Sequence, residues 1–248
     1  MEKTIIACYK NVRNNGKHIR PFIGSDYLNS SPDSLRMMAV GMNAHIKKSD
    51  WDEVSPEWFY GWAKDGKGNQ RHKFFPTVHE EVKEFASFLL KNSTYFSGKH
   101  FSIHKSLYLT NAVTQYLLDS EGKESKDVKK IHVQEGAKRW KEELEILAEN
   151  DVFPHVIVIY GRLFWDDAWK TFGKYENTSK YNNFSVNEYN STEGECWQFL
   201  NQVKVSIKGK EQIVLLIGCH HPAYRRKRKI VPEWFFEQQV FCKFSGIN

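Results

Sequence analysis

The stretch LRMMAVGMN, residues 35–43, decides the fold class, because a near-continuous apolar run in it passes directly into Gly41-Met42-Asn43. Three other short runs have the same character, at residues 107–109, 155–159 and 213–217. Runs of this kind are typical of strands that are covered on both faces, as in a parallel sheet. The four runs therefore predict four strands of one parallel sheet.

Helical patterns lie between these runs. Apolar residues recur at helical spacing in residues 77–91, 134–150 and 162–172, and a C-terminal helix is expected from Pro232. Strands that alternate with helices predict an α/β fold, a three-layer α/β/α sandwich around a central, mainly four-stranded parallel sheet. We expect residues 1–248 to form a single domain, since α/β folds commonly reach this length as one unit.

The charge of the chain favours an anionic partner. The formal net charge is +6, and residues 225–229 are the unbroken basic run RRKRK. Taken alone, such a run is as often a solvated surface segment as a binding site. Its place beside a predicted strand end makes nucleic acid the expected partner.

Other features narrow the class of protein. The four cysteines are scattered and form no Cys-x-x-Cys pair, so neither a zinc site nor an iron–sulfur cluster is expected. No apolar run approaches the roughly 20 residues that span a bilayer, and the N-terminus lacks a secretory pattern. The sequence predicts a cytoplasmic, monomeric protein with no metal, no cofactor and no membrane partner.

Polar residues follow each predicted strand. The first run leads into Gly41-Met42-Asn43-Ala44-His45, the second into Thr110-Asn111, the third into Tyr160-Gly161 and the fourth into His220-His221-Pro222-Ala223. Because ligands of open parallel sheets bind at the carboxyl ends of the strands, these side chains are expected around one site.

These segments resemble the motifs of the uracil-DNA glycosylase superfamily over about residues 22–236. Gly41-Met42-Asn43 is similar to the first motif in its Asn-bearing form, as in the single-strand-selective and mismatch-specific branches. His221-Pro222-Ala223 is similar to the second motif, and Asn111 falls where the superfamily carries its base-reading Asn. The resemblance implies a DNA glycosylase that removes a flipped-out base and leaves an abasic site.

The chemistry of glycosidic bond cleavage assigns roles to the three polar residues. His221 is expected to donate a hydrogen bond to the departing anionic base, and Asn43 to position the attacking water. Asn111 offers a donor and an acceptor together, which suits the Watson–Crick edge of a flipped pyrimidine. Alternatives stay open: Asn43 and Asn111 are also common turn or cap residues, and His220 competes with His221.

Two further groups complete the expected site. Phe74 and Phe75 are candidates for stacking on the base, with Met42 and His45 as further base-contacting residues. A second group is expected to contact single- or double-stranded DNA through phosphates or as a wedge: Tyr224, Arg225, Arg226, Lys227 and Arg228.

Departures from the family pattern leave the base open. Ala44 stands where the superfamily usually has Pro, and Ala223 stands where it has Ser. Besides uracil, a hypermodified base such as a glycosylated cytosine of phage DNA is an alternative substrate, which would imply antiviral defence. A non-catalytic DNA-binding module of the same fold is a further alternative. A different α/β nucleotide-binding enzyme is disfavoured, because no glycine-rich phosphate loop follows any strand.

Overall fold

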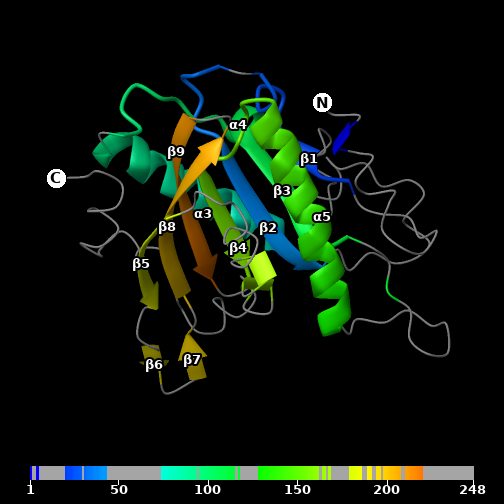
Figure 1. Ribbon diagram of the computed structural model, residues 1–248. Coiled ribbons are helices and arrows are strands. Elements are labelled where there is room, and N and C mark those ends of the chain that lie inside the picture. Colours follow the sequence, from blue (N-terminus) through cyan, green and yellow to red (C-terminus); the bar gives the residue numbers. More distant parts are fainter. Residues whose placement is uncertain are drawn as a thin grey trace.

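The protein has a mixed α/β fold, shown in Figure 1 as a computed structural model. The following residues are described by the structure: 1, 4–5, 20–29, 31–43, 74–93, 95–114, 117, 128–161, 164–165, 167–168, 179–185, 189–191, 194–196, 198–207 and 210–219.

A seven-stranded sheet forms the centre of the described part, in the order β1-β3-β2-β4-β9-β8-β5. A separate two-stranded hairpin joins β6 to β7. The strands are β1 (Phe22–Ile23), β2 (Met37–Asn43), β3 (Leu107–Val113), β4 (Val156–Tyr160), β5 (Ser179–Ser185), β6 (Tyr189–Ser191), β7 (Gly194–Cys196), β8 (Gln198–Ile207) and β9 (Lys210–Cys219).

The four predicted runs are adjacent parallel strands, which confirms that prediction. β2 pairs with β3 on one side and with β4 on the other, and β4 pairs with β9, all in parallel. The sheet is larger than expected, since β1, β8 and β5 add antiparallel strands at its two edges. Residues 179–185, which contain no continuous apolar run, form the edge strand β5.

Two long helices correspond to the predicted helical patterns. These are α3 (Phe74–Asn92) and α5 (Lys130–Glu149), and each begins a few residues before the predicted start. A third helix, α4 (Ile103–Ser106), is a single turn before β3. Most of the helix predicted at residues 162–172 and all of the one from Pro232 lie outside the described residues. No helix in the described part is long and apolar enough to cross a membrane.

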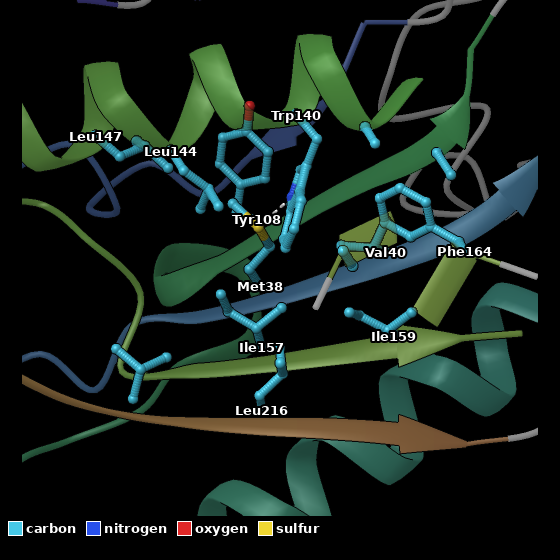
Figure 2. Close-up of a cluster of buried hydrophobic side chains, with 14 of the residues drawn as sticks. Met38, Val40, Tyr108, Trp140, Leu144, Leu147, Ile157, Ile159, Phe164 and Leu216 are labelled. Atoms are coloured by element: carbon cyan, nitrogen blue, oxygen red, sulfur yellow. Dashed lines mark hydrogen bonds between the residues drawn. The ribbon is translucent and has the colours of Figure 1, made fainter. Parts of the chain in front are cut away.

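The two long helices cover opposite faces of the sheet. On the α5 face, Trp140 packs with Met38, Tyr108 and Ile157, all buried, and its indole N–H donates to Met38 Sδ at 3.2 Å (Figure 2). On the α3 face, a second buried cluster joins helix residues to the alternate strand positions: Val78, Val82, Phe85 and Leu89 with Met37, Ala39, Leu107, Leu109, Val156 and Val158. Because strands β2, β3 and β4 contribute to both clusters, they read as continuous apolar runs rather than alternating ones.

Gly136 allows α5 to approach β3 closely. A Cβ at this position would lie 1.9 Å from the carbonyl oxygen of Ala112, and a main-chain atom cannot move away as a flexible side chain can. The packing of α5 on β3 therefore requires a glycine at position 136.

Gly136→Ala is expected to lower the free energy of unfolding by about 1–3 kcal/mol, because the added methyl group overpacks the helix–strand contact. The direction of this change tests the close approach, since replacing Gly with Ala in an unconstrained helix raises the free energy of unfolding by about 1 kcal/mol. Urea denaturation measures the difference. Lys138→Ala, at an exposed position of the same helix, is the control and should stay within about 0.5 kcal/mol of the parent. A more stable Gly136→Ala variant would contradict the close approach.

Candidate active site at the carboxyl edge of the parallel strands

One row of residues crosses the four parallel strands near their carboxyl ends. Asn111 of β3 pairs with Gly41 of β2, and Tyr160 of β4 pairs with Cys219 of β9. Val40 pairs with Ile159, so Gly41 and Tyr160 are one step further along the same register. Strand alternation places the row on the α3 face, since Leu107 and Leu109 of β3 belong to the cluster under α3.

Gly41-Met42-Asn43 and Asn111 lie within strands rather than in the loops that follow them. β2 continues through Asn43, which pairs with Val113 of β3. Both strands are longer than predicted, because each continues for three or four residues beyond the end of its apolar run. The parallel pairing places positions 41 and 111 side by side on the α3 face, whereas Met42 packs against the cluster on the α5 face.

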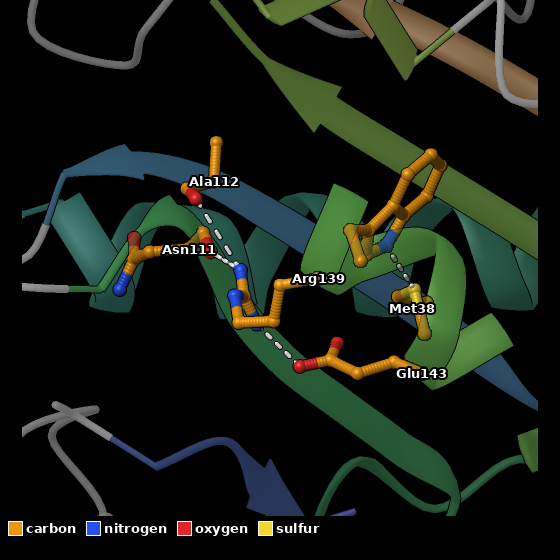
Figure 3. Close-up of polar contacts among 6 residues, drawn as sticks. Met38, Asn111, Ala112, Arg139 and Glu143 are labelled. Atoms are coloured by element: carbon orange, nitrogen blue, oxygen red, sulfur yellow. Dashed lines mark hydrogen bonds and ion pairs between the residues drawn. The ribbon is translucent and has the colours of Figure 1, made fainter. Parts of the chain in front are cut away.

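The main chain at Asn111 is held by a buried arginine (Figure 3). Arg139 of α5 donates from Nη2 to the carbonyl oxygens of Asn111, at 2.5 Å, and Ala112, at 3.3 Å. The side chain of Asn111 points away from this guanidinium, and the residue is fully buried. Arg139 therefore fixes the backbone of Asn111 and leaves its amide group directed elsewhere.

Glu143 makes the buried charge of Arg139 tolerable. It forms an ion pair with Arg139 Nη1, four residues earlier on the same helix face, and both side chains are almost completely buried. Desolvation of two charges costs several kcal/mol for each ion, which their attraction offsets only with good geometry and further hydrogen bonds. The two carbonyl acceptors on β3 supply those further bonds.

A second polar contact joins α3 to the same edge. The hydroxyl of Tyr160 donates to Oε2 of Glu81 at 3.0 Å, and both side chains are buried. Sequence reasoning missed Glu81, although it carries a signal: it is a carboxylate inside the apolar stripe of Val78, Val82 and Phe85. A charge on the buried stripe of an amphipathic helix calls for a specific partner.

The strand order makes the ends of β2 and β4 the expected ligand position. The chain goes from β2 to β3 on one side and then returns to β4 on the other side of β2. Such a reversal is the switch point at which open α/β sheets bind ligands. Here Gly161 has a φ of 118°, a backbone conformation that favours glycine, and a Cβ on it would lie 3.0 Å from Met42 Cε.

The described residues bring together part of the predicted site. Asn43 and Asn111 are on neighbouring strands at one edge, and Phe74 and Phe75 are the first two residues of α3. The remaining predicted residues lie outside the described part: His45, His221, Tyr224, Arg225, Arg226, Lys227 and Arg228. β9 ends at Cys219, two residues before His221, at the register level of Tyr160. The described residues contain no group of three or more His, Cys, Asp or Glu that could hold a metal ion.

The amino edge of the sheet holds a different polar cluster. The backbone N–H of Arg36 donates to Nδ1 of His155 at 3.1 Å, and Arg36 Nε donates to the carbonyl oxygen of Phe153 at 3.1 Å. Burial lowers the pKa of His155 well below its ordinary value, and the nearby charges of Arg36 and Lys99 lower it further. With Nδ1 as an acceptor, this histidine is held neutral as a structural group.

His79 on α3 is also held neutral. Burial lowers its pKa to about 3, and the neighbouring His104 lowers it further. Because both histidines bind a proton more readily in the unfolded chain, acid destabilises the fold.

The free energy of unfolding should be highest above about pH 6.5, the ordinary histidine pKa, and fall as the pH drops toward 3. Each histidine contributes a slope of about 1.4 kcal/mol per pH unit while only the unfolded chain is protonated. His155→Asn keeps an acceptor for the Arg36 N–H but does not titrate, so it should reduce the slope by one histidine. Urea denaturation between pH 7 and 4 measures this, and an unchanged slope in the variant would contradict the assignment.

Comparisons with known proteins give no family for this chain. No model of a protein family matches the sequence, and no curated protein matches it.

Proposed function

We propose that the chain is a monofunctional DNA glycosylase, which hydrolyses the N-glycosidic bond of a flipped-out uracil or other modified base and leaves an abasic site. In this proposal residues 1–248 form one domain, a three-layer α/β/α sandwich. Asn43 and His221 carry the chemistry, Asn111 reads the base, and no metal or cofactor takes part.

The observation that carries the proposal is the setting of Asn111. Its amide is fully buried at the carboxyl edge of the parallel strands, where Asn111 pairs with Gly41 of the strand that ends at Asn43. Arg139 fixes its main chain from the opposite face. A buried amide discriminates strongly between bases, since a base that does not match its donor and acceptor leaves polar groups unpaired.

The proposed chemistry needs a water-poor site. As the glycosidic bond breaks, negative charge develops on the base, and a hydrogen bond from His221 stabilises it best where few waters compete. The row of Asn111, Tyr160 and Cys219 is almost fully buried, which supports such an environment beside the strand ends. Asn43 would orient the attacking water, although an amide is a weaker base than a carboxylate.

His221→Ala should lower the single-turnover rate of base release by about a hundredfold while DNA affinity stays nearly unchanged, because one donor to a developing anion is worth roughly 3 kcal/mol. Asn43→Ala should also slow release, and Asn111→Ala should change which base is accepted. Thr110→Val is the matched control, since it removes a buried polar group from the adjacent position on β3. The substrates to screen are uracil, other deaminated bases and hypermodified phage cytosines in single- and double-stranded DNA.

The outcomes of this screen separate the alternatives. Release at the wild-type rate by His221→Ala would overturn the mechanism. Binding of DNA without release of any base would favour the non-catalytic DNA-binding module.

Replacing Arg225, Arg226 and Lys227 together with Ala should weaken DNA binding for all sequences alike and reduce its dependence on salt. Each phosphate contact releases counterions when the protein binds DNA. Each contact that is lost should therefore reduce the slope of log affinity against log salt concentration by about 0.9 on duplex DNA. Binding measured by fluorescence anisotropy over a range of salt concentrations gives the slope. Lys83, Lys91 and Lys138, on the described helices, replaced together with Ala provide a charge-matched control. If the two triple variants show equal slopes of affinity against salt concentration, the basic run does not belong to the DNA-binding surface.

A further inference from the structure

The direction of α3 is fixed by contacts at both edges of the sheet. Near its start, Glu81 accepts a hydrogen bond from Tyr160, at the carboxyl end of β4. Just beyond its end, the hydroxyl of Tyr95 accepts from the backbone N–H of Ile213, and the ring of Phe96 contacts that of His155 at 6.0 Å between centroids. Both of these contacts lie at the amino edge. α3 therefore begins at the carboxyl edge, where the candidate active site lies.

The first two turns of α3 lie on the carboxyl-edge side of the hydrogen bond between Glu81 and Tyr160. Phe74 precedes Glu81 by seven residues, which corresponds to about 10 Å along a helix. Seven residues are also two nearly complete turns, so the positions of Phe74, Val78 and Glu81 share one stripe of the helix. Val78 and Val82 on this stripe are buried in the cluster under α3. Phe75 precedes Val78 by three residues and Val82 by seven, so positions 74 and 75 are equally in line with the face of α3 that packs on the sheet.

The hydrogen bond between Glu81 and Tyr160 is a directional contact that orients this segment near the edge. Apolar packing of Val78, Val82 and Phe85 holds the helix on the sheet, but it is non-directional and tolerates small shifts. A hydrogen bond between a buried carboxylate and a phenol is directional and short, and it fixes the helix at one register. A displacement of about 1 Å in a base-binding group is enough to lower a rate by roughly a hundredfold.

We propose that Glu81 and Tyr160 form a positioning pair, whose hydrogen bond holds the first two turns of α3, which begin with Phe74 and Phe75, over the carboxyl edge where the flipped base is bound. This inference rests on the proposed glycosylase function. Neither side chain touches the reacting atoms in it. The carboxylate acts as a hydrogen-bond acceptor for Tyr160 and transfers no proton.

The variants that test the pair are Tyr160→Phe and Glu81→Leu, which remove the hydrogen bond, and Glu81→Gln, which keeps an acceptor oxygen without the charge. Tyr108→Phe is the matched control, because it removes a buried hydroxyl from the opposite face of the sheet. Amide hydrogen exchange is measured for residues 74–80 and, as an internal reference, for α5. Single-turnover base release and DNA affinity are measured on the substrate found for the parent protein.

We expect Tyr160→Phe and Glu81→Leu to speed exchange at residues 74–80 about tenfold, with α5 unchanged, and to slow base release about tenfold at nearly constant DNA affinity. Glu81→Gln and Tyr108→Phe should behave as the parent, and the pH profile of the rate should not move in any variant. Unchanged exchange at residues 74–80, or equal loss in Glu81→Gln and Glu81→Leu, would overturn the positioning role. If the parent releases no base from any DNA, the proposed function fails, and the exchange measurement alone then decides whether the hydrogen bond holds these turns.

Discussion

The contact of α5 with the end of β3 is the constraint on which the carboxyl edge depends. In the described part of the chain, β1 pairs with β3 only at Tyr108 and Leu109, so the outer edge of β3 has no strand neighbour beyond them. Buried carbonyl groups that lack a partner cost about 1–3 kcal/mol each. Arg139 donates to the carbonyl oxygens of Asn111 and Ala112, and Gly136 lets the helix come close enough to do so. This contact anchors the end of β3 from the α5 face, while pairing with Gly41 of β2 sets the register of Asn111.

This anchoring has consequences across the sheet. Because Arg139 approaches from the α5 face, the α3 face of the strand ends remains for side chains with other roles, and Asn111, Tyr160 and Glu81 all belong to it. The reversal of chain direction after β3 places α3 and α5 on opposite faces, as expected when crossovers of one hand run in opposite directions. One face thus provides rigidity and the other provides the candidate chemistry.

The parallel strands could be predicted from the sequence because burial on both faces leaves a direct mark, a continuous apolar run such as residues 155–159. β5 left no such mark. Its sequence, SKYNNFS, is polar, and it is a strand only because it pairs with the distant β8. The same limit applies to the site. Asn111 was found by its place near a strand end, but Arg139 and Glu81 act through tertiary contacts that no local spacing encodes, apart from the carboxylate in the apolar stripe of α3.

The two edges of the sheet use buried polar groups in different ways. At the amino edge, His155 is held neutral and accepts a hydrogen bond from the backbone N–H of Arg36. The side chain of Arg36 also donates to the carbonyl oxygen of Phe153, so these bonds join the segment before β2 to the segment before β4. At the carboxyl edge, the bonds of Arg139 and Glu81 fix a strand and a helix without using the amide of Asn111 as their partner. Polar burial is costly wherever it occurs, and it persists where it is compensated by structure or by function. The arrangement at the amino edge is explained by stability alone. At the carboxyl edge, the fully buried Asn111 lies near the switch point, which is where open α/β sheets bind ligands.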